Sequence, residues 1–569
     1  MESFLHYSKC KNDKLHSDFK KLGIENSQNY VPIYKLFFDL NEQNFNSINL
    51  SHSNNIKSIN NLGTESDFLN TNLINCQTSN NENKDVFIKK APLLDPYYFV
   101  MGKYKEAIDD LIKLPTFSCE SKKLNDPFNS AYTDGFFSFL TNQLNEKFNI
   151  IHGTKFYGSY LGFSNFKINI IEDLDYLIKS NYFVKNQNVL FKIDDYQHLY
   201  SNIEKLNPIT IGEDASNMLD DIVSIDNPNL DFQSNNSESD MQMDIELIEP
   251  EEIYNENIGD KEDMDSDTAS RTTYSSRTSL TTLSENGSCE SMNVSDGEES
   301  EGSEDWESID SISSCNEEVN ITFDKFPIHY IMTEKCENTL DYLINNNMIE
   351  KDEWFAILLQ IIFTLIIYQK CFHFTHNDLH TENVMYINTN EKFIYYHFNK
   401  KNYKVPTYGK IFKIIDFGRA IYKVKGKLIY SDEFKYGGNA YGQYNFEPFM
   451  NENKPRLDPN YSFDLCRLGC CIFDYLVEDI EDLPDLLKKN PVVNLIDSWC
   501  RDDNNVLINY KQSGKERYSG FKYYKMIALK VHKHLPILQL QKKEFAKFEI
   551  KKIPNNCNIM NIDNLPVLV

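Results

Sequence analysis

The sequence predicts an α+β fold that is interrupted by a long acidic insertion, and three observations carry this prediction. Short strand-like and helical segments alternate over roughly the first 200 residues. A long apolar segment with helical spacing follows at 355–369, and helical patterns continue to about residue 550. Between about 206 and 320 the chain is rich in Ser, Thr, Asp and Glu, so burial of apolar side chains there cannot offset the entropy of folding. We therefore expect a disordered insertion between two parts of one domain.

The elements before the insertion follow from hydrophobic spacing and from the position of proline. Residues 43–83 are rich in Asn and Ser with weak periodicity, which predicts loops around short strands. Pro92 is expected to end the first long strand. The elements expected next are a strand at 84–96, helices at 104–114 and 132–147, and strands at 148–161 and 189–193.

The charge of the chain is concentrated in the insertion. Residues 211–320 hold 31 of the 85 acidic residues but only three of the 58 basic residues. The remainder carries 55 basic and 54 acidic side chains and is therefore nearly neutral. A general nucleic-acid-binding surface needs an excess of basic residues, so we expect no nucleic-acid partner.

Cysteine spacing and hydropathy favour an intracellular protein without a membrane span. The twelve cysteines form no C-x-x-C pair, and Cys466, Cys470 and Cys471 lie in an apolar helical pattern, which favours reduced core thiols over a metal site. The start, MESFLHYSKCKNDKL, lacks the apolar stretch of a secretory signal. The apolar run 355–369 is short for a membrane span and is interrupted by Gln360, which favours a buried helix.

Two short motifs carry candidate catalytic residues. In HNDLHTEN (376–383) the carboxylate of Asp378 could orient an acceptor hydroxyl and take its proton, and Asn383 could bind Mg²⁺. A second metal-binding carboxylate, Asp416, follows an apolar strand in FKIIDFGRA, and we expect Gly418 to permit the turn that aims it. Each motif alone is also typical of an ordinary polar turn. Their order, and their placement between the expected elements, favour phosphoryl transfer from ATP.

Together these motifs resemble those of the eukaryotic protein kinases. The resemblance implies a two-lobed fold with a small β-rich N-lobe and a mainly helical C-lobe. It also implies that ATP phosphorylates Ser or Thr hydroxyls of a protein substrate, with Asp378 as the base and with Mg²⁺ or Mn²⁺ held by Asn383 and Asp416. The implied boundaries are a divergent N-terminal segment at 1–85, the N-lobe at 86–205, the insertion at 206–320, the last N-lobe strand and hinge at 321–333, the C-lobe at 334–550 and a tail at 551–569.

The same resemblance assigns residues that would hold the site in place. His376 lies in the first motif, and Asp464 in YSFDLCRLGC would brace the loop that contains it. Glu447 in YNFEP would make a buried ion pair. Its partner is either Arg501 or Arg517.

The segment YIMTEKCENTLDYL resembles the kinase hinge, which binds adenine through its backbone. This role would fall to Thr333, Glu334 and Lys335. Asp341, on the helix that follows, could reach the ribose, and it could equally be a solvated acid of that helix.

Two lysines are candidates for the residue that binds the α- and β-phosphates of ATP. No G-x-G-x-x-G motif precedes a strand. VFIK resembles the kinase V-A-I-K motif, which makes Lys89 the first choice and Glu106 its ion-pair partner, with Asp134 as a poorer substitute. The competing assignment takes 153–162 as an irregular phosphate loop and Lys192 as the lysine. Either lysine could instead be an ordinary charge at a strand edge.

Two substitutions depart from the kinase pattern. Asn377 stands where many kinases have the Arg that grips a phosphorylated activation loop, and the segment 419–447 contains Ser431 but no Thr. We therefore expect activity without phosphorylation of this segment. His380 replaces a Lys that contacts the γ-phosphate, and a neutral imidazole supplies little charge near pH 7. The long spacing between the two motifs predicts an extra hairpin between them.

The motif resemblance covers about residues 86–205 and 321–530. With PLLDP, YGKIFKIIDFGRAIYK and NENKPRLDPNYSFDLCRLGC, the pattern resembles kinase-like proteins of giant DNA viruses, which implies the host cytoplasm, or the virion, as the location. The acidic insertion is expected to be either a solubilising linker or a segment that docks partners or accepts phosphate, at sites such as Ser284, Ser295 and Ser303. Two alternatives to a protein kinase remain. One is a pseudokinase that binds nucleotide or a partner without turnover, and the other is a kinase of a small molecule or lipid.

Overall fold

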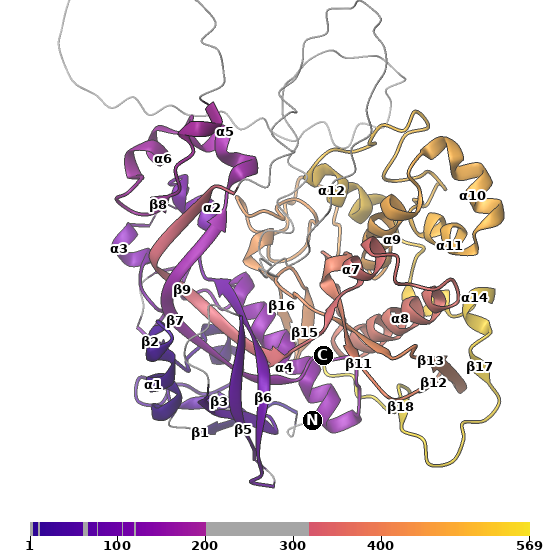
Figure 1. Cartoon of the computed structure of the whole chain (residues 1–569), viewed down its shortest axis with the longest axis horizontal. Helices are drawn as coiled ribbons and strands as arrows, with labels where there is room; N and C mark the ends of the chain where they lie inside the picture. Colours follow the sequence, from indigo (N-terminus) through magenta and orange to yellow (C-terminus); the bar gives the residue numbers. More distant parts are fainter. Residues whose placement is uncertain are drawn as a thin grey trace, which may run out of the picture. The chain divides into compact units, whose positions relative to one another are not determined.

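The structure is a computed structural model, and it describes residues 4–9, 12–60, 67–76, 78–104, 106–118, 121–200 and 318–569. The expected insertion at 206–320, including Ser284, Ser295 and Ser303, lies almost entirely outside these residues. The described residues up to 194 and from 318 onward belong to one compact unit. Its described part is a mixed α+β fold that combines an antiparallel half-barrel sheet with several helices (Figure 1).

The largest sheet is antiparallel and has seven strands. Its order is β2-β7-β9-β6-β5-β4, and β8 pairs with β9. The strands are β2 (Glu25–Gln28), β4 (Asn54–Ile59), β5 (Phe68–Asn75), β6 (Asn81–Pro92), β7 (Phe156–Asn169), β8 (Lys192–Ile193) and β9 (Asn320–Glu334). Strands β4, β5 and β6 form a meander, whereas β9 reaches β6 from much farther along the chain. Because β6 has a neighbour on each side, it lies in the interior of the sheet.

Helix α4 (Ser130–Phe148) is packed against this sheet (Figure 1). Every residue from 131 to 144 is buried. The ring Nδ1 of His329, on β9, lies 2.8 Å from the carbonyl oxygen of Ala131. The side chain of Asn129 accepts the N–H of Ala131 and so caps the helix. These contacts fix the first turns of α4 against the sheet.

The chain after the insertion is mainly helical and is organised around α8 (Glu353–Phe372). Among the described residues, α8 is the helix that by length and composition could cross a membrane, but 89% of its apolar window is buried inside the protein. Burial of this kind is typical of a core helix. The other helices here are α7 (Leu340–Asn345), α9 (Phe463–Leu476), α10 (Leu483–Lys489), α11 (Pro491–Trp499), α12 (Phe521–Lys530), α13 (Pro536–Gln539) and α14 (Lys543–Ala546).

Small sheets accompany these helices and bring the two sequence motifs together. Their strands are β10 (Asn338–Thr339), β11 (Val384–Asn388), β12 (Phe393–Phe398), β13 (Lys401–Pro406), β14 (Lys410–Ile414), β15 (Tyr422–Val424), β16 (Lys427–Ile429), β17 (Glu549–Ile550) and β18 (Ile559–Asn561). Strands β12 and β13 pair as an antiparallel hairpin, so the predicted extra hairpin is confirmed. Strands β11 and β14 pair on either side of it, and the N–H of Ile415 donates to the carbonyl of Asn383 at 3.0 Å. The two motifs therefore lie side by side.

Some of the helices and strands that the sequence predicts before the insertion are present in the structure. The helix expected at 132–147 corresponds to α4, and the strand expected at 84–96 corresponds to β6. The helix expected at 104–114 is wrong, because only α3 (Ile108–Leu111) is helical there. The remaining short elements are β1 (Tyr7–Lys9), α1 (Asp13–Lys21), β3 (Ile48–Leu50), α2 (Pro96–Val100), α5 (Leu174–Leu177) and α6 (Asn181–Asn186).

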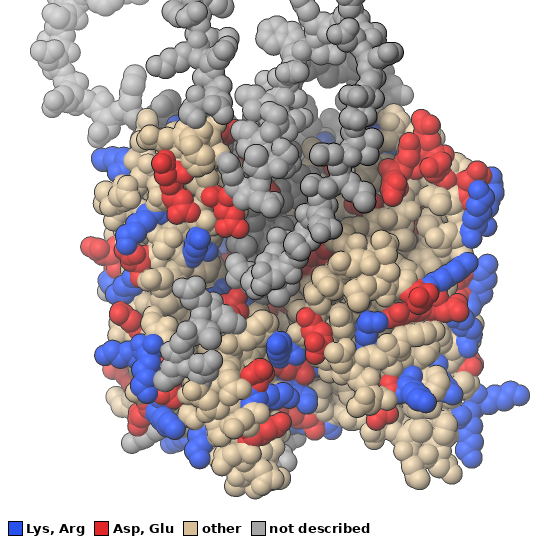
Figure 2. All heavy atoms as spheres, viewed as in Figure 1, with Lys and Arg blue, Asp and Glu red and all other residues tan. Residues whose placement is uncertain are grey.

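Charged side chains of both signs are interspersed on the face drawn in Figure 2. Scattered Lys and Arg side chains lie near Asp and Glu side chains, among a larger area of other residues. This mixture agrees with the near-neutral composition of the chain outside residues 211–320.

Candidate functional site

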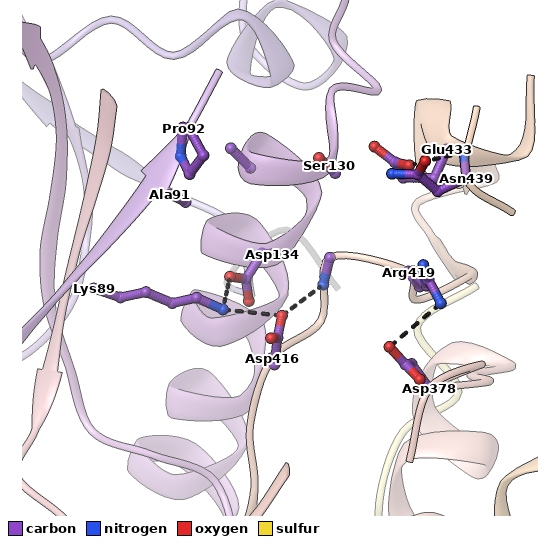
Figure 3. A pocket seen from close by; sticks show the side chains of 12 residues that line it. Lys89, Ala91, Pro92, Ser130, Asp134, Asp378, Asp416, Arg419, Glu433 and Asn439 are labelled. Carbon is purple, nitrogen blue, oxygen red and sulfur yellow. Dashed lines mark hydrogen bonds and ion pairs between the residues drawn. The ribbon is translucent and has the colours of Figure 1, made fainter. Parts of the chain in front are cut away.

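A pocket lies where β6, the start of α4, the loop after α8 and the segment after β14 meet (Figure 3). Four acidic and two basic side chains face this small space. The lining residues are Lys89, Ala91, Pro92, Ser130, Ala131, Asp134, Asp378, Asp416, Gly418, Arg419, Glu433 and Asn439. The structure therefore brings together Lys89, Asp378 and Asp416, which the sequence motifs single out.

Lys89 bridges two carboxylates in the pocket (Figure 3). Its Nζ lies 2.7 Å from Oδ2 of Asp134 and 2.9 Å from Oδ1 of Asp416. Burial alone would lower the pKa of Lys89, but the two carboxylates outweigh burial and raise that pKa above its ordinary value. Burial likewise opposes ionisation of Asp416, but the ammonium group beside it holds its pKa below the ordinary value. The lysine is therefore fully charged and electrostatically satisfied.

Strand alternation and helix packing explain this arrangement. Val86 and Ile88 are buried on one face of β6, whereas Lys89 and Ala91 line the pocket from the other face. Asp134, near the start of α4, is 3% exposed, and burial raises its pKa. This carboxylate also accepts the backbone N–H of Phe417 at 2.9 Å. One side chain thus joins the strand, the helix and the turn at 416–418.

The turn at 416–418 depends on Asp416 rather than on glycine. Asp416 has a φ of +63°, a left-handed conformation that non-glycine residues adopt at a cost. The backbone N–H of Gly418 lies 3.4 Å from Oδ1 of Asp416. Gly418, which was expected to permit the turn, has no positive φ, so the left-handed backbone angle of the turn belongs to Asp416. Strain on a pocket carboxylate is typical of a functional position.

The loop after α8 is held by a buried aspartate. Asp464, in the first turn of α9, is fully buried and accepts the backbone N–H groups of His376 and Asn377, both at 2.9 Å. This is the bracing contact expected for Asp464. The ring Nε2 of His376 donates to the carbonyl of Ile415 at 2.9 Å, and its Nδ1 accepts the N–H of Asp378 at 3.3 Å. His376 therefore connects the loop to the end of the neighbouring strand.

Asp378 meets two side chains that sequence reasoning did not identify. The hydroxyl of Tyr524, on α12, donates to Oδ1 of Asp378 at 2.8 Å. The Nη1 of Arg419 lies 3.5 Å from Oδ2, which is an ion-pair distance. The guanidinium carbon of Arg419 is also 5.8 Å from the ring centre of Tyr524. Both oxygens of this carboxylate are thus oriented by neighbouring groups.

Asn383 and His380 face each other beside Asp378. The Nδ2 of Asn383 donates to the carbonyl of Asp378 at 3.0 Å and lies 3.0 Å from Nε2 of His380. Burial lowers the pKa of His380 to about 4, so its imidazole is neutral at pH 7. Its Nε2 therefore accepts the amide N–H. His380 contributes geometry to the loop and no charge.

Of the two residues expected to bind Mg²⁺, Asp416 lines the pocket and Asn383 does not. No group of three or more His, Cys, Asp or Glu side chains in the described ranges could hold a metal by itself. Mg²⁺, however, commonly takes one or two protein oxygens and completes its shell with phosphate and water. The side-chain oxygens of Asp416 and Asn383 are donors of this kind.

The ion-pair partner of Lys89 differs from the first choice made on the sequence. Glu106 does not contact Lys89. Its carboxylate accepts the Ser121 hydroxyl at 2.5 Å and the backbone N–H of Lys123 at 3.1 Å. These bonds hold Glu106 in an irregular loop before α3, so the prediction that it lies on a helix facing Lys89 is wrong. Asp134 occupies that position instead.

The competing lysine and phosphate loop lie away from the pocket. Lys192 is exposed and pairs with Asp324 at 2.7 Å. The segment 153–162 is mostly β7, whose residues there are buried within the sheet. A side chain on Gly153 would stand 2.5 Å from the carbonyl oxygen of Thr141, so this glycine serves close packing. Neither feature forms a site.

Glu447 does not make the expected buried ion pair. It is exposed, directly after the buried residues 443–446. Arg501 instead pairs with Asp497, and the guanidinium of Arg517 donates to backbone carbonyl groups. The prediction for Glu447 is therefore wrong.

The three residues expected to bind adenine lie at and just after the end of β9. Thr333 pairs with β6 and β7, and the N–H of Glu334 already donates to the carbonyl of Lys155 at 2.9 Å. The carboxylate of Glu334 is buried in an ion pair with Lys413, which outweighs burial and lowers its pKa. Lys335 is exposed, over the ring of Phe68. Glu334 is therefore chiefly a structural residue.

Asp341 was expected either to reach the ribose or to be a solvated acid of its helix. In the structure it accepts hydrogen bonds from other side chains. Its Oδ1 accepts the hydroxyls of Thr381 and Tyr475, each at 2.6 Å. The residue therefore ties α7 to the turn that contains Asn383.

Arg419 and Tyr524 are the functional candidates that motif reading missed. Arg419 directly follows the D-F-G sequence, so its proximity to Asp416 was a usable signal. Tyr524 is 146 residues from Asp378 and carries no local signal, since nothing in its own segment points to the loop.

No protein-family model matches this chain, and none of the curated proteins compared with it is similar in sequence. The functional argument therefore depends on the fold and on the geometry of the pocket.

Proposed function

We propose that this chain is a protein kinase that transfers the γ-phosphoryl group of ATP to Ser or Thr hydroxyls. The proposal is supported by one observation, namely that Lys89, Asp134, Asp378 and Asp416 all line the same pocket. Protein kinases use a lysine on a third strand, an acid on the next helix, a catalytic-loop aspartate and the aspartate of D-F-G. The four pocket residues come from corresponding places in this chain, and two of them belong to motifs that resemble the family.

The order of the elements supports the same proposal. Lys89 is on the third strand of the β4-β5-β6 meander, and α4, which carries Asp134, separates β6 from β7. A mainly helical part follows β9. This succession is the one expected for a β-rich N-lobe and a helical C-lobe. The two-lobed kinase assignment is accordingly part of the proposal.

Each side chain has a defined task in this proposal. Lys89 would leave its carboxylate pair in part to bind the α- and β-phosphates. Asp378 would accept a hydrogen bond from the acceptor hydroxyl and then its proton, within a loop braced by Asp464 and His376. Asn383 and Asp416 would hold Mg²⁺, which when bound neutralises charge on the phosphate oxygens.

The test is transfer of label from γ-labelled ATP in the presence of Mg²⁺. The acceptors are the chain itself, casein, and small alcohols such as inositol and choline. We expect transfer to protein, and we expect D378N to lower it by at least about 10³-fold because the base is lost. K192M is the matched control, since Lys192 is exposed and remote from the pocket. Transfer by D378N at the wild-type rate would contradict the assignment of the site.

A second candidate is a pseudokinase that binds nucleotide without transfer. It is favoured by the neutral His380 and by the Tyr524 hydroxyl, which already occupies Oδ1 of Asp378. Nucleotide binding with no transfer to any of the acceptors would select this candidate. Transfer to the small alcohols alone would instead indicate a small-molecule kinase.

A further inference from the structure

Two partly buried lysines near the segment 419–447 have no acidic partner. Lys525 lies on α12, and Lys454 lies in the chain between Pro448 and α9. Within the part of the chain that the structure describes, neither of them makes an ion pair, and Lys525 contacts an aromatic ring instead. Their ammonium groups are therefore available to a negative group from outside this part of the fold.

The two lysines also lower each other's preference for being charged together. Lys89, Lys123 and Lys413, which are buried or partly buried, each make an ion pair with an Asp or a Glu. Burial lowers the pKa of Lys525, and the positive charge of Lys454 lowers it further. A carboxylate placed between the two ammonium groups would remove this repulsion and offset the cost of burial. The pair is therefore arranged to favour an anionic ligand.

The fold holds the side chain of Lys525 against the segment 419–447. Gly442, in that segment, has a φ of +76°, and a side chain at this position would come within 3.1 Å of Nζ of Lys525. The same Nζ lies 5.7 Å from the centre of the Phe521 ring. Glycine at 442 therefore permits both a left-handed backbone and the close approach of the ammonium group.

Asn445 fixes the loop that carries Lys454. Asn445 is 7% exposed, and its Nδ2 donates to the carbonyl oxygens of Asn451, Lys454 and Pro455 at 3.1, 3.1 and 2.8 Å. Its Oδ1 accepts the backbone N–H of Asn451 at 2.7 Å. The backbone of Lys454 is thus held next to the same segment that Lys525 touches.

Two contacts place Lys525 beside the loop that carries Asp378. Tyr524, which precedes Lys525 on α12, donates its hydroxyl to Oδ1 of Asp378 at 2.8 Å. Tyr444, which follows the point where Lys525 meets the segment 419–447, donates its hydroxyl to Oδ1 of Asn377 at 2.8 Å. An extended chain spans about 3.3 Å per residue. An acidic side chain bound at Lys525 can therefore belong to the same peptide as a hydroxyl placed at Asp378.

We propose that Lys525 and Lys454 form a subsite for an acidic side chain of the acceptor peptide, so that this chain phosphorylates Ser or Thr in acidic segments. The inference rests on the proposed kinase function and names its substrate class. In the transfer the acceptor oxygen bonds to the γ-phosphorus, the bond to the bridging oxygen breaks, ADP leaves and the hydroxyl proton passes to Asp378. The two lysines bind the peptide and take no part in these steps.

An acidic peptide fits this subsite better than a nucleic acid does. Strong binding of a nucleic acid needs many phosphate contacts, whereas two ammonium groups suit one or two carboxylates. The chain itself contains a segment of the required chemistry, SDGEESEGSEDWES at 295–308, with four Ser, seven acidic residues and no basic residue. Its sequence provides the probe for the experiments.

The first experiment measures peptide binding, so that it does not depend on turnover. A fluorescent peptide with the sequence of 295–308 is compared with the same peptide in which the seven acids are replaced by their amides. Anisotropy is measured with the full chain and the Mg complex of the ATP analogue with a β,γ-imido link. We expect wild type to prefer the acidic peptide by about tenfold or more, and K525Q to lose most of this preference.

Two further variants complete the binding experiment. K454Q should lose part of the preference, because the second ammonium group is removed. Lys542 is also partly buried, but it donates to the hydroxyl of Ser498 at 2.7 Å. K542Q is therefore the matched control and should prefer the acidic peptide as wild type does.

The second experiment measures transfer to the same peptides. K525Q should lower kcat/KM for the acidic peptide by about tenfold and bring it close to that for the neutral peptide. K525E should prefer a peptide in which lysines replace the acids, a reversal that a merely structural role of Lys525 would not produce. Incorporation of phosphate at 295–308 of the chain itself is followed by mass spectrometry in the same samples, and it should decrease in K525Q.

The outcomes separate this inference from the proposed function. Equal affinity of wild type for both peptides, together with equal incorporation at 295–308 in wild type and K525Q, would overturn the subsite and leave the kinase proposal standing. An acid preference that depends on Lys525, without any transfer, would overturn the kinase assignment and leave a site for acidic peptides. Binding of a single-stranded oligonucleotide that depends on Lys525, with no response to the acidic peptide, would overturn the proposed substrate class.

The proposal stays testable if K525Q does not fold. In that case K525R, which keeps the charge, should retain the acid preference, and K454Q should lose part of it. An unchanged preference in K454Q would then overturn the subsite.

Discussion

The carboxylate of Asp432 lies 2.6 Å from the Nζ of Lys123 and accepts the backbone N–H of Ser130 at 3.1 Å. Asp432 belongs to the segment 419–447, which follows the D-F-G turn, whereas Lys123 and Ser130 lie just before and at the start of α4. The contact therefore ties this segment to the helix that carries Asp134. A carboxylate therefore supplies a fixed negative charge at this point of the segment.

A second set of contacts holds the segment 419–447 through Asn377, the asparagine that stands where many kinases have arginine. The hydroxyl of Tyr444 donates to Oδ1 of Asn377 at 2.8 Å, and the Nδ2 of Asn377 donates to the carbonyl of Arg419. Ser431 is fully buried, and its hydroxyl oxygen accepts the N–H of Glu433. The described contacts hold the segment through uncharged hydrogen bonds and through the ion pairs of Asp432 with Lys123, Arg419 with Asp378 and Lys435 with Asp126.

We predict that phosphate on this segment is not needed for activity. Protein treated with phosphatase, and verified to be unphosphorylated at 419–447 by mass spectrometry, should transfer phosphate within about twofold of untreated protein. S431A should lose only the stability of a small turn cap, about 1 kcal/mol, and keep its rate. A loss of activity above tenfold in either sample would show that phosphorylation is required.

We predict that D432N is strongly destabilising. The change leaves the ammonium of Lys123 in a largely buried site without its carboxylate, and breaking a buried ion pair in this way costs about 3 kcal/mol. Burial lowers the pKa of Lys123, but Asp432 outweighs burial and raises it, so the charge persists and must be solvated on mutation. Urea unfolding at pH 7 measures the effect. D458N, which removes a carboxylate from an exposed pair, is the control, and equal midpoints for the two variants would refute the prediction.

The two short motifs could be interpreted from the sequence because each is local. Asp378, Asn383 and Asp416 lie in the turns that their motifs define, so their places at the ends of the neighbouring strands could be predicted from local spacing, whereas the chemistry assigned to them belongs to the proposal. The hairpin β12–β13 could be predicted for a similar reason, since the extra length between the motifs had to leave and return to adjacent strands.

Contacts between distant segments could not be predicted in the same way. The choice between Glu106 and Asp134 depended on which helix packs against β6, and both lay on segments with helical spacing. The buried face of α4 and its contact with His329 decide for Asp134, whereas the bonds of Glu106 to Ser121 and Lys123 keep its loop irregular. Such tertiary contacts override local helix propensity.

The comparison of D134N with E106Q tests this assignment. We predict that D134N lowers ATP affinity and abolishes most transfer, because Lys89 is then left with Asp416 alone and shifts toward it. E106Q should reduce stability by about 1 kcal/mol through weakened loop hydrogen bonds and should leave the Michaelis constant for ATP unchanged. Transfer kinetics with varied ATP measure both effects. The reverse order of effects would restore Glu106 as the functional acid.

We predict that three buried histidines make the folded protein less stable in mild acid. Burial lowers the pKa values of His52, His152 and His329 to about 4 each. In the unfolded chain these pKa values return to about 6.5. Between pH 6.5 and 4 the unfolded state therefore binds more protons than the folded state, so the free energy of unfolding decreases as the pH falls through this window. Each histidine should account for about 2 kcal/mol between pH 8 and pH 5.

Urea unfolding of wild type and H152Q at pH 8 and pH 5 measures the contribution of one such histidine. The ring of His152 lies between the carbonyl of Phe412, at 2.8 Å from Nδ1, and the hydroxyl of Tyr396, at 2.7 Å from Nε2. The neutral ring can donate to the first and accept from the second, whereas a protonated ring would oppose the Tyr396 hydroxyl with a second donor. H152Q should be less stable than wild type at pH 8 but should lose about 2 kcal/mol less on going to pH 5. An equal loss in wild type and H152Q would exclude His152 as a source of the acid sensitivity.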